Sequence, residues 1–297
     1  MSLPPSLSKA FEKDDVCTPQ RNALDSYGNY FSKDILVGAA GGALVGAGAA
    51  AAAHQDFKTS LAIVLTGLFV GAATGYWASV QSKASTQAAR RRLVEKDVTD
   101  ENGKVDGAHV AFNRLIDCRR KQAATIRADV KAGRLTREQG EAQMADVKKR
   151  YDEDVATAKG INADMASHAA NLEYANEQFK PQPYVTLNPT TVYADKSTGS
   201  AKLTSYKADA TISGASDKDW IKVALAGGRT GYVQAKDVEL QAARLAKDKK
   251  TRKTPPAAAS GDPVAEGVFT NLSKRADFDD SVQTASTNTS GFELSGG

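Results

Sequence analysis

Two uncharged stretches constrain the fold of this chain more than any other feature. Residues 35–53 and residues 61–80 contain no charged side chain, and a short polar loop separates them. As a helix, the 19 residues of the first stretch would extend about 28 Å, close to the thickness of the hydrocarbon core of a bilayer. Tyr76 and Trp77 lie near the end of the second stretch, where interfacial aromatic residues are expected. The pattern predicts a transmembrane helical hairpin over residues 34–82.

Both stretches carry a glycine at every fourth position. These glycines are Gly38, Gly42 and Gly46 in the first stretch and Gly67, Gly71 and Gly75 in the second. Small residues favour helix pairing in lipid because they allow close backbone approach. The two stripes resemble the glycine-zipper two-helix membrane domains of bacterial envelope proteins. The resemblance implies anchoring in the lipid bilayer and packing into a homo-oligomer. A buried helical hairpin or a Gly/Ala-rich loop is the alternative.

Residues 83–180 contain no proline and are rich in Ala, Lys, Arg, Glu and Asp, a composition that favours helices. Turn-forming residues gather at 99–107, and they predict a break in the helix. Gly133 is placed to end one helix. Thr136 and Gln139 form a capping box that opens the next helix.

Apolar side chains recur every three or four residues from Met144 to Phe179, and a matching face runs from Phe112 to Val130. This periodicity predicts an antiparallel coiled-coil stalk. His168 falls on the seam, where we expect a packed or hydrogen-bonded side chain rather than a ligand. The charged face of the stalk mixes acidic and basic residues, so we expect it to be solvated and to bind no nucleic acid.

The composition changes in residues 184–240, after Pro181 and Pro183 end the helical region. β-Branched and aromatic residues become frequent and turn-forming clusters recur, which predicts a small barrel of short strands. Residues 226–229 predict a hairpin turn between two of these strands.

Residues 184–240 resemble a bacterial SH3 domain. The late pattern that carries the resemblance is Trp220, Val223, Gly227, Gly228, Gly231, Tyr232 and Val233, and the opening runs from Leu187-Asn188-Pro189 to Val192-Tyr193. The usual Asn-Val-Arg-x-Gly-Pro opening of that family is absent, which leaves the ligand open. The resemblance implies a non-catalytic module that binds peptidoglycan or a protein segment.

The resemblance also implies which side chains would line a ligand groove. They are Tyr193, Trp220 and Tyr232, because aromatic side chains offer rigid, amphipathic contact area. Packing of Trp220 and Tyr232 in the core of the barrel is the alternative interpretation.

The two ends of the chain differ from the regions between them. Residues 1–33 form a polar N-terminal segment. Residues 241–297 begin with basic side chains and continue rich in Ala, Ser and Thr, so we expect a disordered tail. Residues 268–272 form a candidate docking motif within that tail, although a spacer is the simpler interpretation.

The chain carries 2 cysteines and 3 histidines, which excludes a disulfide framework and a His/Cys metal cluster. No nucleophile elbow, phosphate loop or dinucleotide fingerprint occurs. We therefore expect no enzyme, no metal and no cofactor. Cys17 and Cys118 either pair in an oxidising compartment or remain free thiols.

Together these features predict a multi-domain membrane protein with a transmembrane hairpin, a coiled-coil stalk, an SH3-like barrel and a disordered tail. We expect a non-enzymatic envelope scaffold in the bacterial inner membrane, with two spans and both termini on the same side. Basic residues flanking the hairpin favour cytoplasmic termini, whereas the SH3 resemblance favours a periplasmic module, and we prefer the periplasmic orientation. The alternative is a membrane-active component of a secretion system, or a secreted effector, that uses the glycine-rich hairpin.

Overall fold

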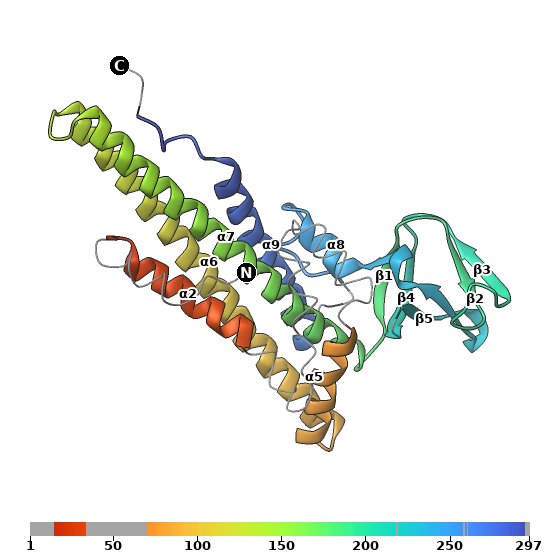
Figure 1. The fold of residues 1–297 in the computed structure, drawn as a ribbon. Coiled ribbons are helices and arrows are strands. Elements are labelled where there is room, and N and C mark those ends of the chain that lie inside the picture. Colours follow the sequence, from red (N-terminus) through yellow and green to blue (C-terminus); the bar gives the residue numbers. More distant parts are fainter. Residues whose placement is uncertain (1–14, 34–69, 218, 258, 260, 295–297) are drawn as a thin grey trace. The chain divides into compact units, whose positions relative to one another are not determined.

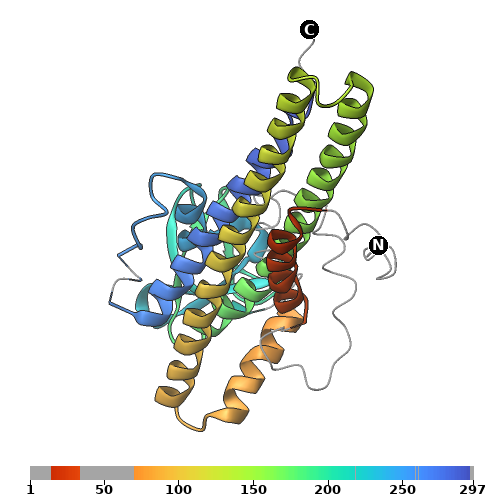
Figure 2. The same ribbon diagram turned by 90° about the vertical axis from the view of Figure 1, so that its left-hand side faces the viewer.

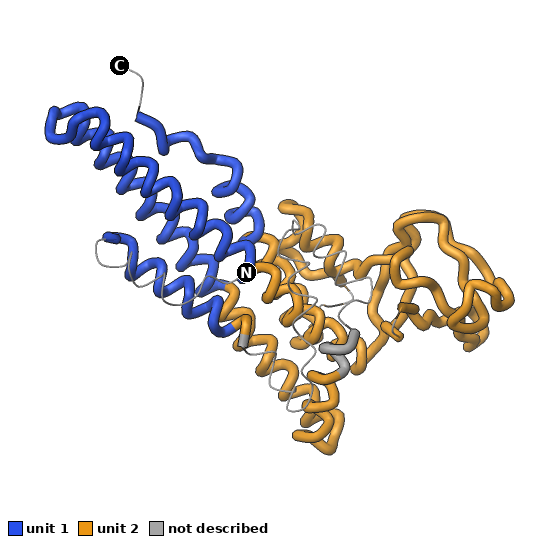
Figure 3. The backbone as a smooth tube through the Cα atoms, in the orientation of Figure 1, with its two compact units in different colours: residues 1–30, 106–161, 278–297 blue, residues 31–105, 162–277 orange. Residues whose placement is uncertain are grey.

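The structure is a computed structural model that describes residues 15–33 and 70–294, apart from 218, 258 and 260. These residues form helices and an antiparallel sheet (Figure 1). The chain divides into two compact units, each combining segments that are distant in the sequence (Figure 3). Unit 1 comprises residues 1–30, 106–161 and 278–297, and unit 2 comprises residues 31–105 and 162–277.

Helices supply most of the described chain. They are α2 (Thr18–Lys33), α5 (Val70–Lys83), α6 (Gln87–Lys131), α7 (Arg137–Glu177), α8 (Gln241–Lys247) and α9 (Pro263–Thr287). The long helices α6, α7 and α9 each contribute residues to both units.

In unit 1, α6 and α7 lie side by side as an antiparallel hairpin (Figures 1 and 2). Gly133 lies in the turn that joins them and has a φ of 71°, a left-handed conformation that favours glycine. The amide of Gln139 donates to Thr136 Oγ1 at 3.2 Å, and the amide of Thr136 donates to Gln139 Oε1 at 3.0 Å. The predicted turn and capping box are confirmed.

The predicted apolar seam forms the core of unit 1. Its buried members include Phe112, Leu115, Ile126, Met144, Val147, Tyr151, Val155, Ala158 and Ile161. Two further helices contribute to this unit, so it is a bundle rather than a two-helix stalk. A disulfide between Cys17 and Cys118 fastens the start of α2 to α6. The C-terminal part of α9 covers the same core.

The prediction of a disordered tail over residues 241–297 is wrong, because most of this region is helical. Phe278, in α9, packs edge-on against Phe112 at a centroid distance of 5.8 Å. The hydroxyl of Tyr151 donates to the carbonyl of Ala285 at 2.7 Å. Apolar side chains recur along this segment at helical spacing, and their burial stabilises the helix that polar composition alone would not predict.

The predicted break at residues 99–107 is also wrong, since α6 runs through it without interruption. The glycine at 107 serves packing instead of a turn. A Cβ atom there would lie 2.2 Å from the Tyr27 hydroxyl oxygen, so the missing side chain lets α2 approach α6 within unit 1. Contacts between helices stabilise the helical conformation of residues 99–107 more than their turn-forming composition disfavours it.

The prediction of a transmembrane hairpin, and with it of a two-span inner-membrane protein, is contradicted. Among the described residues, no helix combines the length and the apolar character needed to cross a bilayer. Residues 35–53 and 61–69 lie outside the described part of the chain. The end of the second stretch belongs to α5, where Tyr76 and Val80 pack in the protein core of unit 2.

The sheet of unit 2 has seven strands in the order β3-β2-β6-β5-β4-β1-β7, and every pair is antiparallel. The strands are β1 (Gln182–Thr186), β2 (Thr190–Tyr193), β3 (Lys202–Tyr206), β4 (Thr211–Asp217), β5 (Trp220–Ala224), β6 (Thr230–Gln234) and β7 (Val238–Leu240). A short 3₁₀ turn, Ala235–Asp237, precedes the last strand. The sequence predicts about six short strands for this β domain, and the structure has seven.

One face of the sheet is buried in the core of unit 2. Val192, Ile221, Val223 and Val233 are each no more than 2% exposed. Strand residues alternate between the two faces, so their neighbours in sequence face outward. This alternation positions the candidate site.

Candidate functional site

Three aromatic side chains gather on the outer face of the sheet. Tyr193 ends β2, Trp220 begins β5, and Tyr232 lies in β6. All three are half-buried, whereas the valines and isoleucine beside them in sequence are buried. We call these three residues the aromatic surface. The alternative in which Trp220 and Tyr232 form the barrel core does not agree with their exposure.

Strand register brings the aromatic surface together. Tyr193 pairs directly with Tyr232 across β2 and β6. The Trp220 ring stands edge-on to the Tyr193 ring, with a centroid distance of 5.8 Å and an interplanar angle of 86°. Edge-to-face aromatic pairs of this kind are stabilised beyond the area they bury. These residues lie up to 39 positions apart in the sequence, and the pairing of strands in the sheet brings them together.

Two glycines shape the strands that carry the aromatic surface. A Cβ atom at Gly231 would lie 2.4 Å from Val192 Cγ1 and 3.1 Å from the Tyr193 carbonyl oxygen. Only glycine therefore allows β2 to approach β6 this closely. The hairpin between β5 and β6 turns at Gly227 and Gly228, whose φ values are 73° and 74°. The glycines of the predicted pattern are thus explained by geometry, and the predicted hairpin turn at 226–229 is confirmed.

An ion pair borders the aromatic surface. Lys196, in the loop after β2, places Nζ 2.7 Å from Asp217 Oδ2 and 5.9 Å from the centroid of the Tyr232 ring. The hydrogen bond to Asp217 raises the pKa of Lys196, so the cation persists over the Tyr232 ring. The sequence analysis missed both residues, because a loop lysine and a strand-end aspartate carry no pattern of their own.

The end of α7 holds the strand that leads into the site. The amide of Ser216 donates to Glu177 Oε2 at 2.9 Å, and the Tyr184 hydroxyl donates to Glu177 Oε1. Burial raises the pKa of Glu177, while the hydrogen bonds from Tyr184 and Ser216 act in the opposite direction. Ser216 is followed directly by Asp217, so this contact positions the β4–β5 hairpin that carries the ion pair and Trp220.

The predicted helix-packing glycines are largely outside the described residues. Gly38, Gly42, Gly46 and Gly67 lie there, and Gly71 lies in the first turn of α5. Apart from the neighbouring backbone of α5 itself, no described atom lies within 4 Å of the position of a Cβ atom at Gly75. Their packing role, like homo-oligomer formation, stays a prediction.

The described histidines and cysteines form no joint site. His109 bonds to Ser281 Oγ at 2.8 Å in unit 1, and His168 Nε2 bonds to the Phe31 carbonyl at 3.0 Å in unit 2. The packed, hydrogen-bonded state expected for His168 is confirmed. Among the residues that the structure describes, no cluster of three or more His, Cys, Asp or Glu side chains could hold a metal ion.

Comparison with known proteins adds no family assignment. No protein-family model matches the chain, and no curated protein and no solved structure is significantly similar to it. The geometry described above is therefore the basis for any functional conclusion.

Proposed function

We propose that this protein is a non-enzymatic binding protein whose β domain recognises an extended peptide segment of a partner protein on the aromatic surface. The single observation that carries the proposal is the clustering of Tyr193, Trp220 and Tyr232, half-buried, on the outer face of the sheet. Tyrosine and tryptophan dominate binding energy at many protein interfaces because they bury large area at low entropic cost. Grooves lined by such rings bind extended, proline-rich segments.

The fold of the β domain supports the same conclusion. A small domain of short strands is what the resemblance of residues 184–240 to bacterial SH3 domains implies, and the antiparallel sheet exposes one face to a ligand. The ion pair of Lys196 and Asp217 at the border offers one cation and one anion to polar groups of a ligand. Binding to cell-wall peptides is the competing outcome, which the experiment below distinguishes.

The experiment uses the full chain with Trp77→Phe, so that Trp220 is the single tryptophan and reports on the surface directly. Trp77 packs edge-on against Phe179, so phenylalanine preserves an aromatic contact. Peptides selected from a random library against this variant should change Trp220 fluorescence on binding. Tyr232→Ala should weaken binding about tenfold or more, the loss typical of an interface hot spot.

Tyr27→Ala is the matched control, because Tyr27 is a half-buried tyrosine on α2, in unit 1, that is not part of the aromatic surface. It should leave peptide affinity unchanged. Selection of the same peptides by the wild type and by Tyr232→Ala would refute the proposal. Sedimentation with purified cell-wall sacculi, and no enrichment of peptides, would assign the surface to cell-wall material instead.

A further inference from the structure

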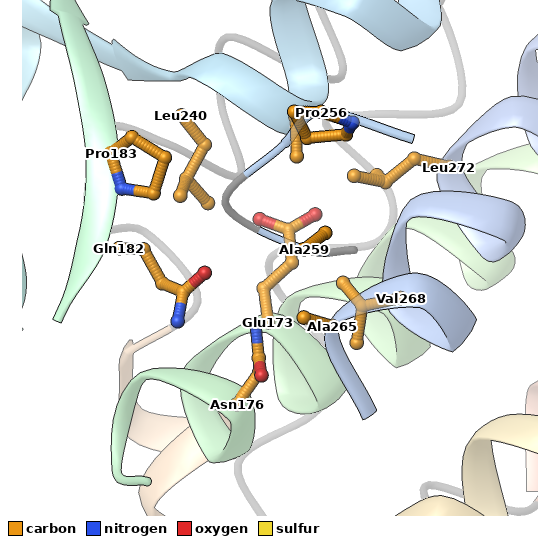
Figure 4. A pocket seen from close by; sticks show the side chains of 11 residues that line it. Glu173, Asn176, Gln182, Pro183, Leu240, Pro256, Ala259, Ala265, Val268 and Leu272 are labelled. Atoms are coloured by element: carbon orange, nitrogen blue, oxygen red, sulfur yellow. The ribbon is translucent and has the colours of Figure 1, made fainter. Parts of the chain in front are cut away.

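A cavity inside unit 2 is too small for an organic ligand. Its volume is about 20 Å³, and its lining includes Leu240, Val268 and Leu272. Figure 4 shows these apolar side chains around it, with the carboxylate of Glu173 among them. A cavity needs about 10–15 Å³ to accommodate one water molecule, so this space suits no more than a water. The outer face of the sheet, by contrast, is open to solvent and carries charged side chains beside the aromatic surface.

Strand register places two lysines in line with two of the aromatic side chains. Lys202 of β3 pairs with Tyr193, and Lys222 of β5 pairs with Tyr232. The two tyrosines pair with each other, so the four residues form one continuous row across β3, β2, β6 and β5. Side chains directly opposite each other on neighbouring strands lie on the same face of a sheet. We call these four residues the lysine–tyrosine row.

The lysines at the two ends of the row have no acidic partner in the part of the chain that the structure describes. Lys202 and Lys222 are both exposed, and neither forms an ion pair with a described residue. A third cation, Lys196, lies over the Tyr232 ring, but Asp217 holds it at 2.7 Å and offsets its charge. The row therefore presents two uncompensated cations, one at each end of a pair of tyrosine rings.

The row also sets the spacing of the two cations. Neighbouring strands lie about 4.8 Å apart, so the three intervals from β3 to β5 separate the Cα atoms of Lys202 and Lys222 by roughly 14 Å. An extended peptide rises about 3.3 Å per residue, so about four residues cover this distance. Residues four positions apart in an extended segment point to the same side. A segment lying across the strands would thus bring its side chains i and i+4 to the two lysines.

An acidic group beside Trp220 limits which anions this face accepts. Asp217 pairs directly with Trp220 across β4 and β5. A continuous polyanion such as a nucleic acid carries a charge on every unit and would bring some of its phosphates close to this carboxylate. Like charges that meet in an interface weaken binding. The face therefore suits separate carboxylates better than a continuous run of negative charge.

We propose that the partner segment bound by the aromatic surface is acidic, with carboxylate side chains at positions i and i+4 that pair with Lys202 and Lys222. An apolar side chain at i+2, such as proline, packs on the rings of Tyr193 and Tyr232. This inference rests on the proposed function and adds the charge and the spacing of the ligand. The rings supply contact area, and the lysines select for charge. Exposed ion pairs of this kind each change affinity about two- to fivefold.

Peptide sets of defined charge test the proposal on the full chain with Trp77→Phe, in which Trp220 fluorescence reports binding. Three sets of heptapeptides share the form x-Z-x-Pro-x-Z-x, where x is a neutral residue other than tryptophan and Z is glutamate, glutamine or lysine. The glutamate set should bind about tenfold more tightly than the glutamine set, because two ion pairs contribute, and the lysine set should bind most weakly. Sodium chloride at about 500 mM should remove this preference, since salt screens exposed charges.

A fourth set tests the spacing. Its two glutamates lie three positions apart, so they point to opposite sides of an extended segment. This set should bind about two- to fivefold more weakly than the glutamate set, because only one carboxylate reaches a lysine. Equal binding of the two sets would overturn the proposed spacing.

Substitutions of the two lysines test which residues select the charge. Lys202→Gln and Lys222→Gln should each reduce the preference for the glutamate set about two- to fivefold, and the double variant should bind the glutamate and glutamine sets equally. Lys131→Gln is the matched control, because it removes the same charge from an exposed lysine of unit 1. It should keep the preference of the wild type. An equal loss in Lys131→Gln would show that net charge, and not the row, selects the peptide.

The remaining outcomes separate this proposal from the proposed function. Equal binding of the three charge sets, abolished by Tyr232→Ala, would overturn the acidic specificity and leave peptide recognition by the aromatic surface in place. Failure of every set to bind, while peptides from the random library do bind, would have the same meaning. Failure of the library as well would overturn both proposals. Tighter binding of a single-stranded dodecamer of thymidylate than of the glutamate set would assign the lysines to a polyanion and overturn the acidic peptide.

Discussion

The two units bury charge in opposite ways. In unit 1, the fully buried Arg119 donates to Asp154 Oδ2 at 2.7 Å and to Asp15 Oδ1 at 2.6 Å. In unit 2, Glu173 is also buried, but it forms no ion pair with another described residue, although the charge of Arg275 acts to lower its pKa. Burial raises the pKa of Asp154, whereas hydrogen bonds hold the pKa of Asp15 below its ordinary value, so Asp15 makes unit 1 sensitive to acid. Burial raises the pKa of Glu173 to about 8, so this carboxyl group makes unit 2 sensitive to alkali.

The largest expected effect comes from removing the cation of unit 1. Arg119→Met should lower the free energy of unfolding by about 3–5 kcal/mol, because two carboxylates lose their buried partner. Urea unfolding followed by circular dichroism measures this change. Arg134→Met is the control, since Arg134 pairs with Asp129 near the surface and should contribute less than about 1 kcal/mol. Equal effects of the two substitutions would show that the buried network is not a stabilising feature.

The next effect concerns the covalent link between α2 and α6. Replacing both Cys17 and Cys118 by alanine should cost about 2–4 kcal/mol, because the disulfide closes a loop with a sequence separation of 101. Hydrogen exchange of the α2 amides should rise before that of α7. A dithiol reductant should produce the same increase in the wild type and none in the variant. If exchange in α2 is unchanged by reduction, the ion pairs alone hold this helix.

The comparison of the units predicts opposite pH limits. Burial acts to raise the pKa of Asp15, but hydrogen bonds from Arg119 and from the Cys17 amide bring it below the ordinary 3.8. Its contribution to stability is present above pH 3.8 and is lost as pH falls below that value. Asp15→Asn should therefore reduce the loss of unit 1 stability at low pH. At pH 7 it should lower the free energy of unfolding by about 1.5–3 kcal/mol, the loss typical of a charge-assisted hydrogen bond. Exchange of the Ala259 amide in unit 2 should not change.

The smallest effect tests the unbroken helix α6. Apart from the neighbouring backbone of α6 itself, no described atom lies within 4 Å of the position of a Cβ atom at Gly103, which is exposed in the middle of the helix. Gly103→Ala should stabilise the protein by up to about 1 kcal/mol, the difference in helix propensity. Gly231→Ala is the opposite control, because its Cβ would collide with β2. If Gly103→Ala does not raise the thermal unfolding temperature, the result would argue for the predicted turn at 99–107 and against an unbroken helix.

Local signals were interpreted correctly where the responsible contacts are also local. The capping box of Thr136 and Gln139 and the turn at Gly133 depend on residues within a few positions. The helix at the C-terminus had a comparable signal that the sequence analysis missed. Asp262 directly precedes α9, and its Oδ1 atom accepts hydrogen bonds from the amides of Val264 and Ala265 in the first turn of that helix. An acid followed by proline and by apolar residues at every fourth position is typical of a helix start.

The uncharged stretch 61–80 shows why hydropathy alone does not predict the surroundings of a segment. A run of apolar residues suits either lipid or a protein core, and local sequence does not distinguish the two. Tyr76 and Val80 face a core built with Val94, Val98 and Leu172, and the Tyr76 hydroxyl donates to Asp97 at 2.9 Å. These partners are distant along the chain, so the pattern of charges could not predict them.

The sequence by itself determined the helix ends around Gly133 and Thr136 and the apolar seam of unit 1, because each follows from backbone geometry over a few residues. Only the tertiary structure decided that Cys17 meets Cys118, that Lys196 meets Asp217, and that Trp220 stands edge-on to Tyr193. These contacts join residues far apart in sequence. Burial then sets the protonation and reactivity of such groups, and burial is a property of the folded chain.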